Sequence, residues 1–302
     1  MPVAQRLTNV ISSYPNPSPD GERVLFQSNR TGRFEIYVMN VDGGDLTQLT
    51  DRPGDNVIPV WSRDGALIAF ASSPDGNSDI FLMNADGGEW RRLTDHPGDD
   101  SHPHWLAGGS RIIFNSSRTT PDLDADWSSQ WHEIFSMNVD GTQLRQHTNC
   151  RTVCTYPSFS PDGTRIAYRK VTDTPGFSWD LTTGRRNSEV FVANVDGSNE
   201  VNLSNNAGFD GWPVWSPDGT QIVFASNRAG PANVGQLYVV NADGAGLRQI
   251  TSGPWGHVQP AWSSDGRRIY AYQHQETESY EFGDVVVFDS RILDGIDDRV
   301  RQ

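Results

Sequence analysis

The sequence predicts an all-β protein, a six-bladed β-propeller with four antiparallel strands in each blade. Three observations support this fold class. One template recurs six times along the 302 residues, each copy contains short alternating apolar runs bounded by Asp-Gly turns, and the tail of a repeat stands alone near the N-terminus. Four strands in a repeat of roughly 40 to 45 residues are typical of a propeller blade.

The repeated template reads x-Pro-x-aromatic-Ser-Pro-Asp-Gly, an apolar strand, a polar turn, a second apolar strand, Asn-x-Asp-Gly, and a short strand ending in Leu-Thr. It is clearest in residues 58–94 and 212–251. Glycine accepts the positive φ of the Asp-Gly turns, and aspartate bonds to nearby amides. The anchoring prolines are Pro15, Pro59, Pro103, Pro157, Pro213 and Pro260. The predicted blades are 14–50, 58–94, 102–148, 156–204, 212–251 and 259–289, within one domain spanning 1–302.

The last blade is expected to take its outermost strand from the N-terminus. Residues 5–9, "QRLTN", form the tail of a repeat without its body, whereas the last copy has a body, "DVVVFD", and no clear Leu-Thr tail. Pairing the two would hide the edges that an open ring exposes. We therefore expect an N-terminal strand to close the last blade.

Composition limits the class of partner. The formal net charge of −14 argues against the basic surface that nucleic-acid binders use. No apolar run reaches the roughly 18 to 20 residues of a membrane span, and the N-terminus lacks the pattern of a signal peptide. We expect no nucleic-acid binding, no membrane insertion and a monomer. Cys150 and Cys154 either form a loop disulfide in an oxidising compartment or remain free thiols, and the sequence leaves both open.

The repeats "SPDGERVLFQSNRTGRFEIYVMNVDGGDLTQLT" and "SPDGTRIAY…EVFVANVDGSNEVNLS" resemble the WD-like repeats of the TolB-type six-bladed propeller family over residues 5–289. Because the repeats begin almost at residue 1, we expect no counterpart of the family's separate N-terminal α/β domain within these residues. Two departures are Pro17, where other blades carry Trp or Phe, and "WLAGGSR" in blade three. The resemblance favours a periplasmic or secreted protein, whereas the missing signal-peptide pattern leaves a cytosolic protein open.

One face of the propeller is predicted to bind. The loops that enter the inner strands and the loops that join second to third strands share this face, the top face, whereas most Asp-Gly turns lie on the bottom face. Blades three and four have long top loops, and scaffolds vary the loops that bind. The residues before the six prolines are expected around the channel mouth: Tyr14, Ile58, His102, Tyr156, Trp212 and Gln259.

The predicted ligand-binding residues offer aromatic rings with polar tips, which suit a sugar ring or a protein segment. They are Tyr14, His102, Tyr156, Trp212, Trp255, His257, Gln259, Trp131 and Trp179, with Trp127 and Tyr280 nearby. The alternative is that these rings only pack the long loops onto the rim.

The loop "DLDADWSSQWHE" of blade three has the carboxylate spacing of a calcium-binding loop. Positions one, three, five and twelve are Asp122, Asp124, Asp126 and Glu133. The sixth position is Trp127, where that pattern expects glycine. The alternative is a solvated acidic loop.

Histidines suggest a second metal site and a catalytic alternative. His102, His104, His257 and Gln259 stand near the channel in sequence register and could hold a transition metal. Propellers of the oligogalacturonate lyase family, which resemble this chain weakly, use His and Gln around a metal. In that case His102 or His257 would act as general base, and Arg151 and Arg186 would neutralise a uronate carboxylate. Otherwise these histidines bond to loop backbones.

The sequence therefore predicts a non-catalytic recognition module that binds a protein partner or a glycan through the top face and channel mouth. The alternative is a carbohydrate-active enzyme of the metal-dependent lyase type. The chain has no Gly-x-Ser-x-Gly elbow, phosphate-binding loop or His-Glu-x-x-His pattern.

Overall fold

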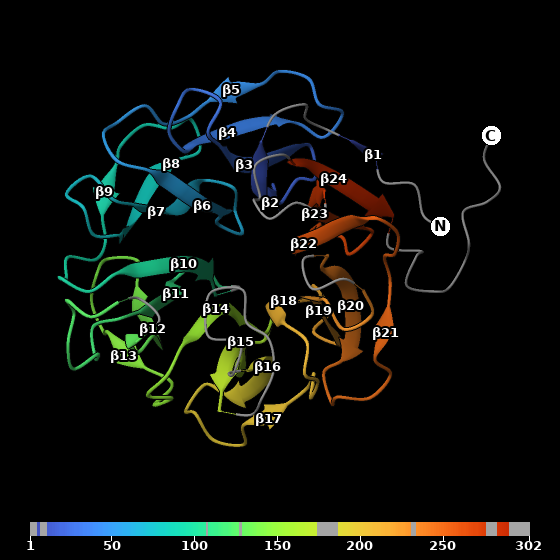
Figure 1. The fold of residues 1–302 in the computed structure, drawn as a ribbon. Coiled ribbons are helices and arrows are strands. Elements are labelled where there is room, and N and C mark those ends of the chain that lie inside the picture. The colour runs from blue at the N-terminus through green and yellow to red at the C-terminus, as the bar shows by residue number, and fades with distance from the viewer. Residues whose placement is uncertain are drawn as a thin grey trace, which may run out of the picture.

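The computed structural model describes residues 5–6, 11–106, 108–126, 129–173, 187–230, 234–275 and 283–289. These residues form six four-stranded antiparallel sheets arranged around a central channel (Figure 1). The predicted fold class, a six-bladed all-β propeller, is confirmed. No helix in the described ranges has the length and apolarity needed to cross a membrane.

The strands of each of the first five blades follow one another from the channel outward. Blade one comprises β2 (Ser12–Pro17), β3 (Arg23–Ser28), β4 (Glu35–Asn40) and β5 (Thr47–Gln48). Blade two comprises β6 (Asn56–Trp61), β7 (Leu67–Ser72), β8 (Asp79–Asn84) and β9 (Arg91–Arg92). Blade three comprises β10 (Asp100–Trp105), β11 (Arg111–Ser116), β12 (Glu133–Asn138) and β13 (Arg145–Gln146).

The remaining blades follow the same plan. Blade four comprises β14 (Cys154–Phe159), β15 (Arg165–Thr172), β16 (Asn187–Asn194) and β17 (Val201–Asn202). Blade five comprises β18 (Asp210–Trp215), β19 (Gln221–Ser226), β20 (Gln236–Asn241) and β21 (Arg248–Gln249). Blade six comprises β22 (Trp255–Trp262), β23 (Arg268–Gln275), β24 (Gly283–Asp289) and the N-terminal β1 (Gln5–Arg6).

The ring is closed by β1, as predicted. It pairs antiparallel with β24, so that Gln5 lies opposite Val287 and Arg6 opposite Val286. Figure 1 shows this dark blue strand beside the red strand of blade six. Because the outermost strand of blade six comes from the other end of the chain, its hydrogen bonds hold the first and last blades together.

The hydrophobic core lies between neighbouring blades. Between blades two and three, for example, Ala69 and Phe114 are fully buried in one cluster with Trp105. The indole nitrogen of Trp105 donates to the carbonyl oxygen of Val60 at 3.1 Å, which ties the two inner strands together. Aromatic residues of the repeated template thus pack between blades, which is the structural role that the repeat predicts for them.

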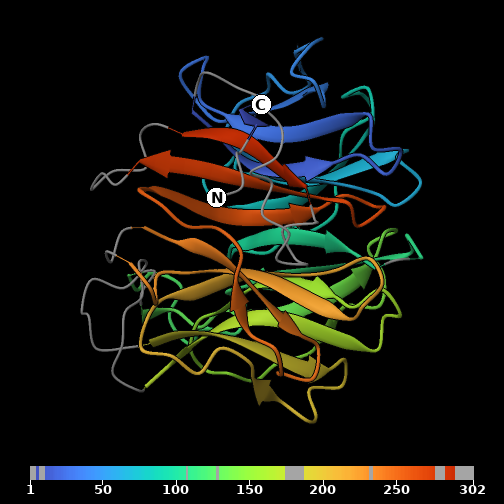
Figure 2. The same cartoon turned by 90° about the vertical axis from the view of Figure 1, so that its right-hand side faces the viewer.

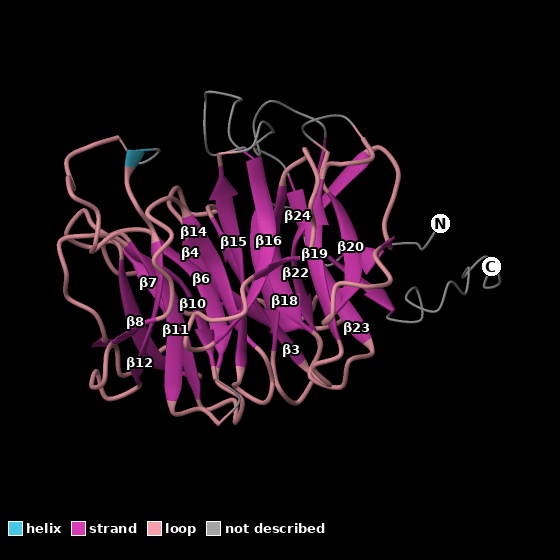
Figure 3. Cartoon of the chain, turned by 90° about the horizontal axis from the view of Figure 1, so that it is seen from below, coloured by secondary structure: helices cyan, strands magenta, loops and turns pink. Residues whose placement is uncertain are grey.

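Loops gather on the two faces of the disc, as the side views show (Figures 2 and 3). On the bottom face, the Asp-Gly turn of blade two is typical. Ser62 donates its hydroxyl to Asp64 Oδ1 at 2.6 Å, the amide of Ala66 donates to the same oxygen at 3.1 Å, and Gly65 has a φ of 71°. The turn itself therefore explains why aspartate and glycine recur in most blades.

Candidate functional site

Each inner strand contains a bulge at the dipeptide that carries the repeated proline. In blade one, the register of β2 against β3 shifts between Ser13 and Asn16 and so skips Tyr14 and Pro15. The same shift recurs in the other five blades. Proline has no amide hydrogen for the ladder, so an inner strand tolerates it at a bulge. A bulge also re-aims the side chain of the extra residue.

The residues before the six prolines share a left-handed backbone, and all line the central channel. We call them the channel ring: Tyr14, Ile58, His102, Tyr156, Trp212 and Gln259. Their φ angles lie between 52° and 55°. Such a conformation costs of order 1–3 kcal/mol for a non-glycine residue, so the surrounding blade must hold it in place.

Two side chains hold the backbone of the ring. The amide of Ile58 donates to Gln27 Oε1 at 2.8 Å, and the amide of Tyr14 donates to Gln259 Oε1 at 3.0 Å. The second bond joins blade six to blade one at the channel, whereas β1 closes the ring at the outer edge of blade six. Gln259 is therefore in part a structural residue.

The side chains of the ring touch one another across the channel. The hydroxyl of Tyr14 lies 3.3 Å from His102 Nε2 and accepts a hydrogen bond from Trp212 Nε1 at 3.4 Å. The His102 ring meets Tyr156 edge-on, with centroids 4.4 Å apart, and Tyr156 stacks on Trp212 at 5.2 Å. Blades one, three, four and five thus contribute to one continuous aromatic and polar cluster.

A cavity of about 230 Å³ adjoins the ring inside the channel. Its wall continues with the next inward residues of the six strands, Asn16, Val60, His104, Ser158, Val214 and Ala261. It then reaches Pro217, Ser263 and Ser264 at the bottom face. The site therefore extends toward the bottom face, whereas the sequence placed it at the top-face mouth. None of the described lining residues is Asp, Glu, Lys or Arg.

The two histidines of the channel are uncharged at neutral pH. Burial lowers the pKa of His102 to about 3 and that of His104 to about 4, because the protonated ring would lose its hydration. His104 Nδ1 and Ser158 Oγ are buried without a hydrogen-bond partner among the described residues. The described lining thus carries no charge, although the buried guanidinium of Arg169 lies 5.4 Å from the centre of the Tyr156 ring, and it retains polar atoms that a bound group could satisfy.

The structure does not bring His257 to this site. His257 lies on β22 with 5% of its surface exposed, inside blade six. Its Nδ1 is 3.3 Å from Gln236 Oε1 and its Nε2 is 3.0 Å from Gln273 Nε2. In the strand register His257 lies opposite Gln273 of β23. This makes His257 equivalent to Asp100 of blade three and not to His102. The proposed grouping of His257 with His102 and His104 around one ion is therefore wrong.

Two other predicted aromatic residues, Trp255 and Trp131, are described and lie outside the channel lining. Trp255 begins β22 and is 37% exposed, and its carbonyl accepts a hydrogen bond from Gln236. Trp131 is half-buried, and its amide donates to Thr120 Oγ1 at 3.0 Å. Neither lines the cavity. Outside the described residues lie Trp127, Trp179, Arg186 and Tyr280.

Glu133 has a structural role. It opens β12, is 1% exposed, and accepts three hydrogen bonds: from Thr148 Oγ1 at 2.6 Å, from the amide of Cys150 at 2.8 Å and from the amide of Arg151 at 2.7 Å. We call this contact between the start of the third strand and the tail of the blade the carboxylate latch.

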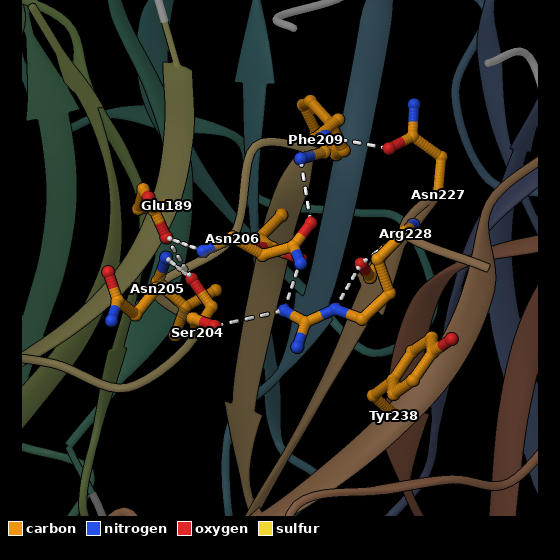
Figure 4. Close-up of polar contacts among 12 residues, drawn as sticks. Glu189, Ser204, Asn205, Asn206, Phe209, Asn227, Arg228 and Tyr238 are labelled. Atoms are coloured by element: carbon orange, nitrogen blue, oxygen red, sulfur yellow. Dashed lines mark hydrogen bonds and ion pairs between the residues drawn. The ribbon is translucent and has the colours of Figure 1, made fainter. Parts of the chain in front are cut away.

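The latch recurs in four other blades. The pairs are Thr50 with Glu35, Thr94 with Asp79, Ser204 with Glu189 and Thr251 with Gln236, whose amide oxygen replaces the carboxylate. Figure 4 shows the copy in blade four, where Glu189 also accepts the amide of Asn206, beside the Arg228 side chain that donates to the carbonyl of Ser204. Because the same contact occurs in several blades, its role is to stabilise the blade structure.

The remaining carboxylates of the acidic loop are not gathered with Glu133. Asp122, Asp124 and Asp126 are exposed, and Asp122 Oδ1 accepts the amide of Asp124 at 3.0 Å. In the described part of the chain, the one group of three potential metal ligands within 4.8 Å comprises Glu133, Cys150 and Cys154. Calcium binding by this loop stays a prediction, and its closing ligand is engaged elsewhere.

Cys150 and Cys154 form a disulfide, which decides the question that the sequence left open. The bridge closes the loop that leads into β14. Arg151, inside this loop, has a φ of 50° and donates its amide to Glu133. Arg151 is not among the described residues that line the channel cavity, whereas His102 is.

Sequence reasoning named His104 but missed the second ring of the channel wall as a set, in particular Ser158 with its buried hydroxyl. The signal was available, because each of these residues follows an anchoring proline by one position. Residues that alternate along an inner strand face the same side, and the bulge shifts that alternation.

Comparison with known proteins agrees with the fold. Residues 5–122 and 180–293 match the family model described as the TolB beta propeller domain. A protein TolB homolog of Chlorobium luteolum is 32% identical over 136 residues, which are 35% of this chain and 31% of the relative. The match thus spans about a third of that relative's length.

Two solved structures illustrate the range of proteins with this architecture. A putative TolB from Agrobacterium tumefaciens superposes with a TM-score of 0.65 at 21% identity, covering 93% of this chain and 91% of that one. An oligogalacturonate lyase in complex with manganese superposes with a TM-score of 0.63 at 18% identity, covering 95% and 78%. At these identities the likeness concerns the fold alone. The family match covers most of the repeats, and the chain belongs to the TolB β-propeller family.

Proposed function

We propose that this chain is a non-catalytic binding module whose channel receives an uncharged side chain of a partner protein. The observation that carries the proposal is the channel ring, which surrounds a neutral cavity with aromatic faces and hydrogen-bonding tips. Tyr and Trp combine a large apolar area with a polar end, and they dominate the residues that anchor protein partners.

The dimensions of the cavity support a single side chain. Its volume of about 230 Å³ is below the roughly 300 to 1,000 Å³ of pockets that enclose whole small molecules. Because Ile58 shares the left-handed backbone of the ring, that conformation belongs to the blade architecture. The distinguishing feature is therefore the choice of side chains at the other ring positions.

A neutral sugar ring has related chemistry but fits less well. Sugar recognition needs polar side chains that turn toward the ligand, whereas Tyr14, Trp212 and His102 already use polar atoms on one another. An apolar or aromatic side chain needs only the ring faces. We therefore favour a protein partner over a glycan.

The test is to select peptides from a phage-displayed random library on the purified chain and to measure their affinities for two variants. We expect Tyr156→Ala to weaken the selected peptides by about thirtyfold, the effect of truncating an aromatic anchor at the centre of an interface. Trp255→Ala, which truncates an exposed ring outside the cavity, serves as the matched control and is expected to bind like the wild type.

Two outcomes would contradict the proposal that the channel binds a side chain of a partner protein. Dependence on Trp255 with indifference to Tyr156 would place binding on the top rim. Binding of neutral oligosaccharides with no enriched peptide would favour a glycan. Thermal melts of both variants show whether the fold is retained.

The lyase alternative is motivated by the fold shared with an oligogalacturonate lyase. That chemistry needs a cation to neutralise the uronate carboxylate and a base of suitable pKa. The described lining of the channel holds no Arg or Lys, and the lowered pKa of His102 makes it a weak base. Incubation with oligogalacturonate and Mn²⁺, followed by ultraviolet absorbance of an unsaturated product, tests it. Turnover that disappears in His102→Ala would overturn the non-catalytic proposal.

A further inference from the structure

The fourth blade, at its junction with blade three, differs from blades one, two, three and five at one set of equivalent positions. Strand register makes Tyr168 of β15 equivalent to Phe26, Phe70, Phe114 and Phe224 in blades one, two, three and five. The same register makes Lys170 equivalent to Ser28, Ser72, Ser116 and Ser226. On the neighbouring outer strands, Glu200 is equivalent to Leu46, Trp90, Leu144 and Leu247. At these three positions blade four has Tyr, Lys and Glu, whereas those four blades have Phe, Ser and either Leu or Trp.

The junction between blades one and two shows the position occupied by an aromatic side chain, whereas the equivalent Leu46, Leu144 and Leu247 are exposed. Trp90 packs edge-on against Phe70, with centroids 4.8 Å apart, and against Phe81 at 6.2 Å. Arg52 from blade one lies over the Trp90 ring at 4.5 Å. An aromatic side chain therefore fills this junction, and the indole nitrogen is satisfied by the carbonyl of Gly87 at 2.9 Å.

At the junction of blades three and four, the polar groups stand beside a cavity instead. Glu200 accepts a hydrogen bond from the buried hydroxyl of Tyr168, and its other oxygen accepts one from Lys170 Nζ at 2.6 Å. Lys170 Nζ also lies 4.9 Å from the centre of the Phe191 ring. A cavity of about 670 Å³ opens here, within the size range of small-molecule pockets. We call it the junction cleft; its wall comprises Gln146, His147, Thr148, Asn149, Cys150, Tyr168, Lys170, Asp196, Gly197 and Glu200.

The wall of the junction cleft is held in place by hydrogen bonds and by the disulfide. His147 is held by the carbonyl of Val195 at 2.5 Å and the hydroxyl of Ser136 at 2.8 Å. The disulfide of Cys150 and the carboxylate latch of Thr148 fix the other side. The residues that match the family model omit 123–179, which contains Lys170 and most of the wall. The cleft is therefore a feature of this chain more than of the shared repeat.

We propose that the junction cleft binds a neutral ligand with neighbouring hydroxyl groups, such as a monosaccharide or a polyol. Glu200 and Lys170 place a hydrogen-bond acceptor beside a donor with three N–H groups, and a vicinal diol can donate to the first while it accepts from the second. Asp196 adds a carboxylate to the wall, so an anionic ligand is repelled. This site is separate from the channel, and the proposal does not depend on the function proposed for the channel.

The test titrates the purified chain with glucose, galactose and mannose, and separately with glycine and glucuronate, by saturation-transfer NMR. Glu200→Leu installs the residue that blades one, three and five carry at this position, and Lys170→Ser installs the serine that they share. Both changes copy a side chain that the fold already accepts. We expect at least one neutral sugar to bind, and both variants to weaken it by about tenfold or more, because each removes a charge-assisted hydrogen bond.

A matched pair of turn variants separates the cleft from general effects. Asp196 and Asp243 occupy the same turn in blades four and five, and each accepts an amide two residues on, at 3.0 Å and 2.9 Å. Asp196→Asn should change sugar affinity, whereas Asp243→Asn should not. The proposal is overturned if no neutral sugar binds, if glycine or glucuronate binds in preference, or if affinity is unchanged in Glu200→Leu and Lys170→Ser proteins that melt like the wild type.

Discussion

Replacing Glu133 by alanine tests whether this residue is a structural latch or a calcium ligand. In the wild type, its buried carboxylate accepts hydrogen bonds from Thr148 Oγ1, from the amide of Cys150 and from the amide of Arg151. Alanine removes all three acceptors at once. The two amides belong to the disulfide loop that leads into β14, so the substitution loosens the connection between blades three and four.

The expected cost follows from these contacts. A hydrogen bond to a charged group contributes about 1.5–3 kcal/mol, and contributions within one network do not add fully, so about 3 kcal/mol is expected for the set. Unfolding entropy is about 2.1 cal/mol/K per residue, or about 0.6 kcal/mol/K for the 302 residues of this chain. The melting temperature of Glu133→Ala should therefore fall by about 5 °C.

Calorimetry of wild type and variant, each with calcium and with EDTA, distinguishes the two roles. The latch predicts the same decrease in both conditions and no effect of Asp122→Asn. Glu133→Gln is the graded control, because blade five uses Gln236 at the same position and still bonds to Thr251. If calcium raised the melting temperature of the wild type and both Glu133→Ala and Asp122→Asn abolished the rise, the latch account would be refuted.

Three further predictions concern other elements. Burial, and secondarily His274, lowers the pKa of His257 to about 4. The stability that the neutral ring contributes is complete above pH 6.5 and is lost as the pH falls toward 4, by up to about 3 kcal/mol. His257→Gln should therefore flatten the acid side of a curve of stability against pH, and parallel curves for variant and wild type would contradict this. Replacing Cys150 and Cys154 by alanine should lower the free energy of unfolding by about 2 kcal/mol, which is the loop-closure entropy expected for so short a loop. Urea titration measures this change, and the reduced wild type should unfold like the variant. Gly211→Ala should destabilise by about 1–3 kcal/mol, since a Cβ there would meet the Phe209 ring at 2.6 Å; an unchanged melting temperature would show that Phe209 moves freely.

The membership of the channel ring was predictable, but its geometry was not. The residue before each proline could be listed by counting, because the repeat keeps the proline in register. His257 was misplaced because it was compared with His102 as a histidine, although it lies three residues before its proline and His102 lies directly before its own. Counting from the proline would have separated them.

Glu133 illustrates a pattern with two explanations. The spacing of acidic residues suggested calcium, yet the same residue opens the third strand, where blades one, two and four also have an acidic residue. Alignment of the repeats shows this, whereas the loop by itself does not. The polar set of Tyr168, Lys170 and Glu200 is also visible in such an alignment, but only the packing reveals that a cavity accompanies it.

The sequence by itself determined the number of blades, the order of strands and the closure by the N-terminal strand. These follow from alternation and turn chemistry, which act over a few neighbouring residues, and from the repeat, which applies them six times. Only the tertiary structure decided which side chains meet. The bulge re-aims each ring residue into the channel, and a cavity lies at the junction between blades three and four, where Glu200 stands in the position that Trp90 occupies in blade two. Contacts across the channel and between blades join residues far apart in the chain, and no local pattern specifies their distance.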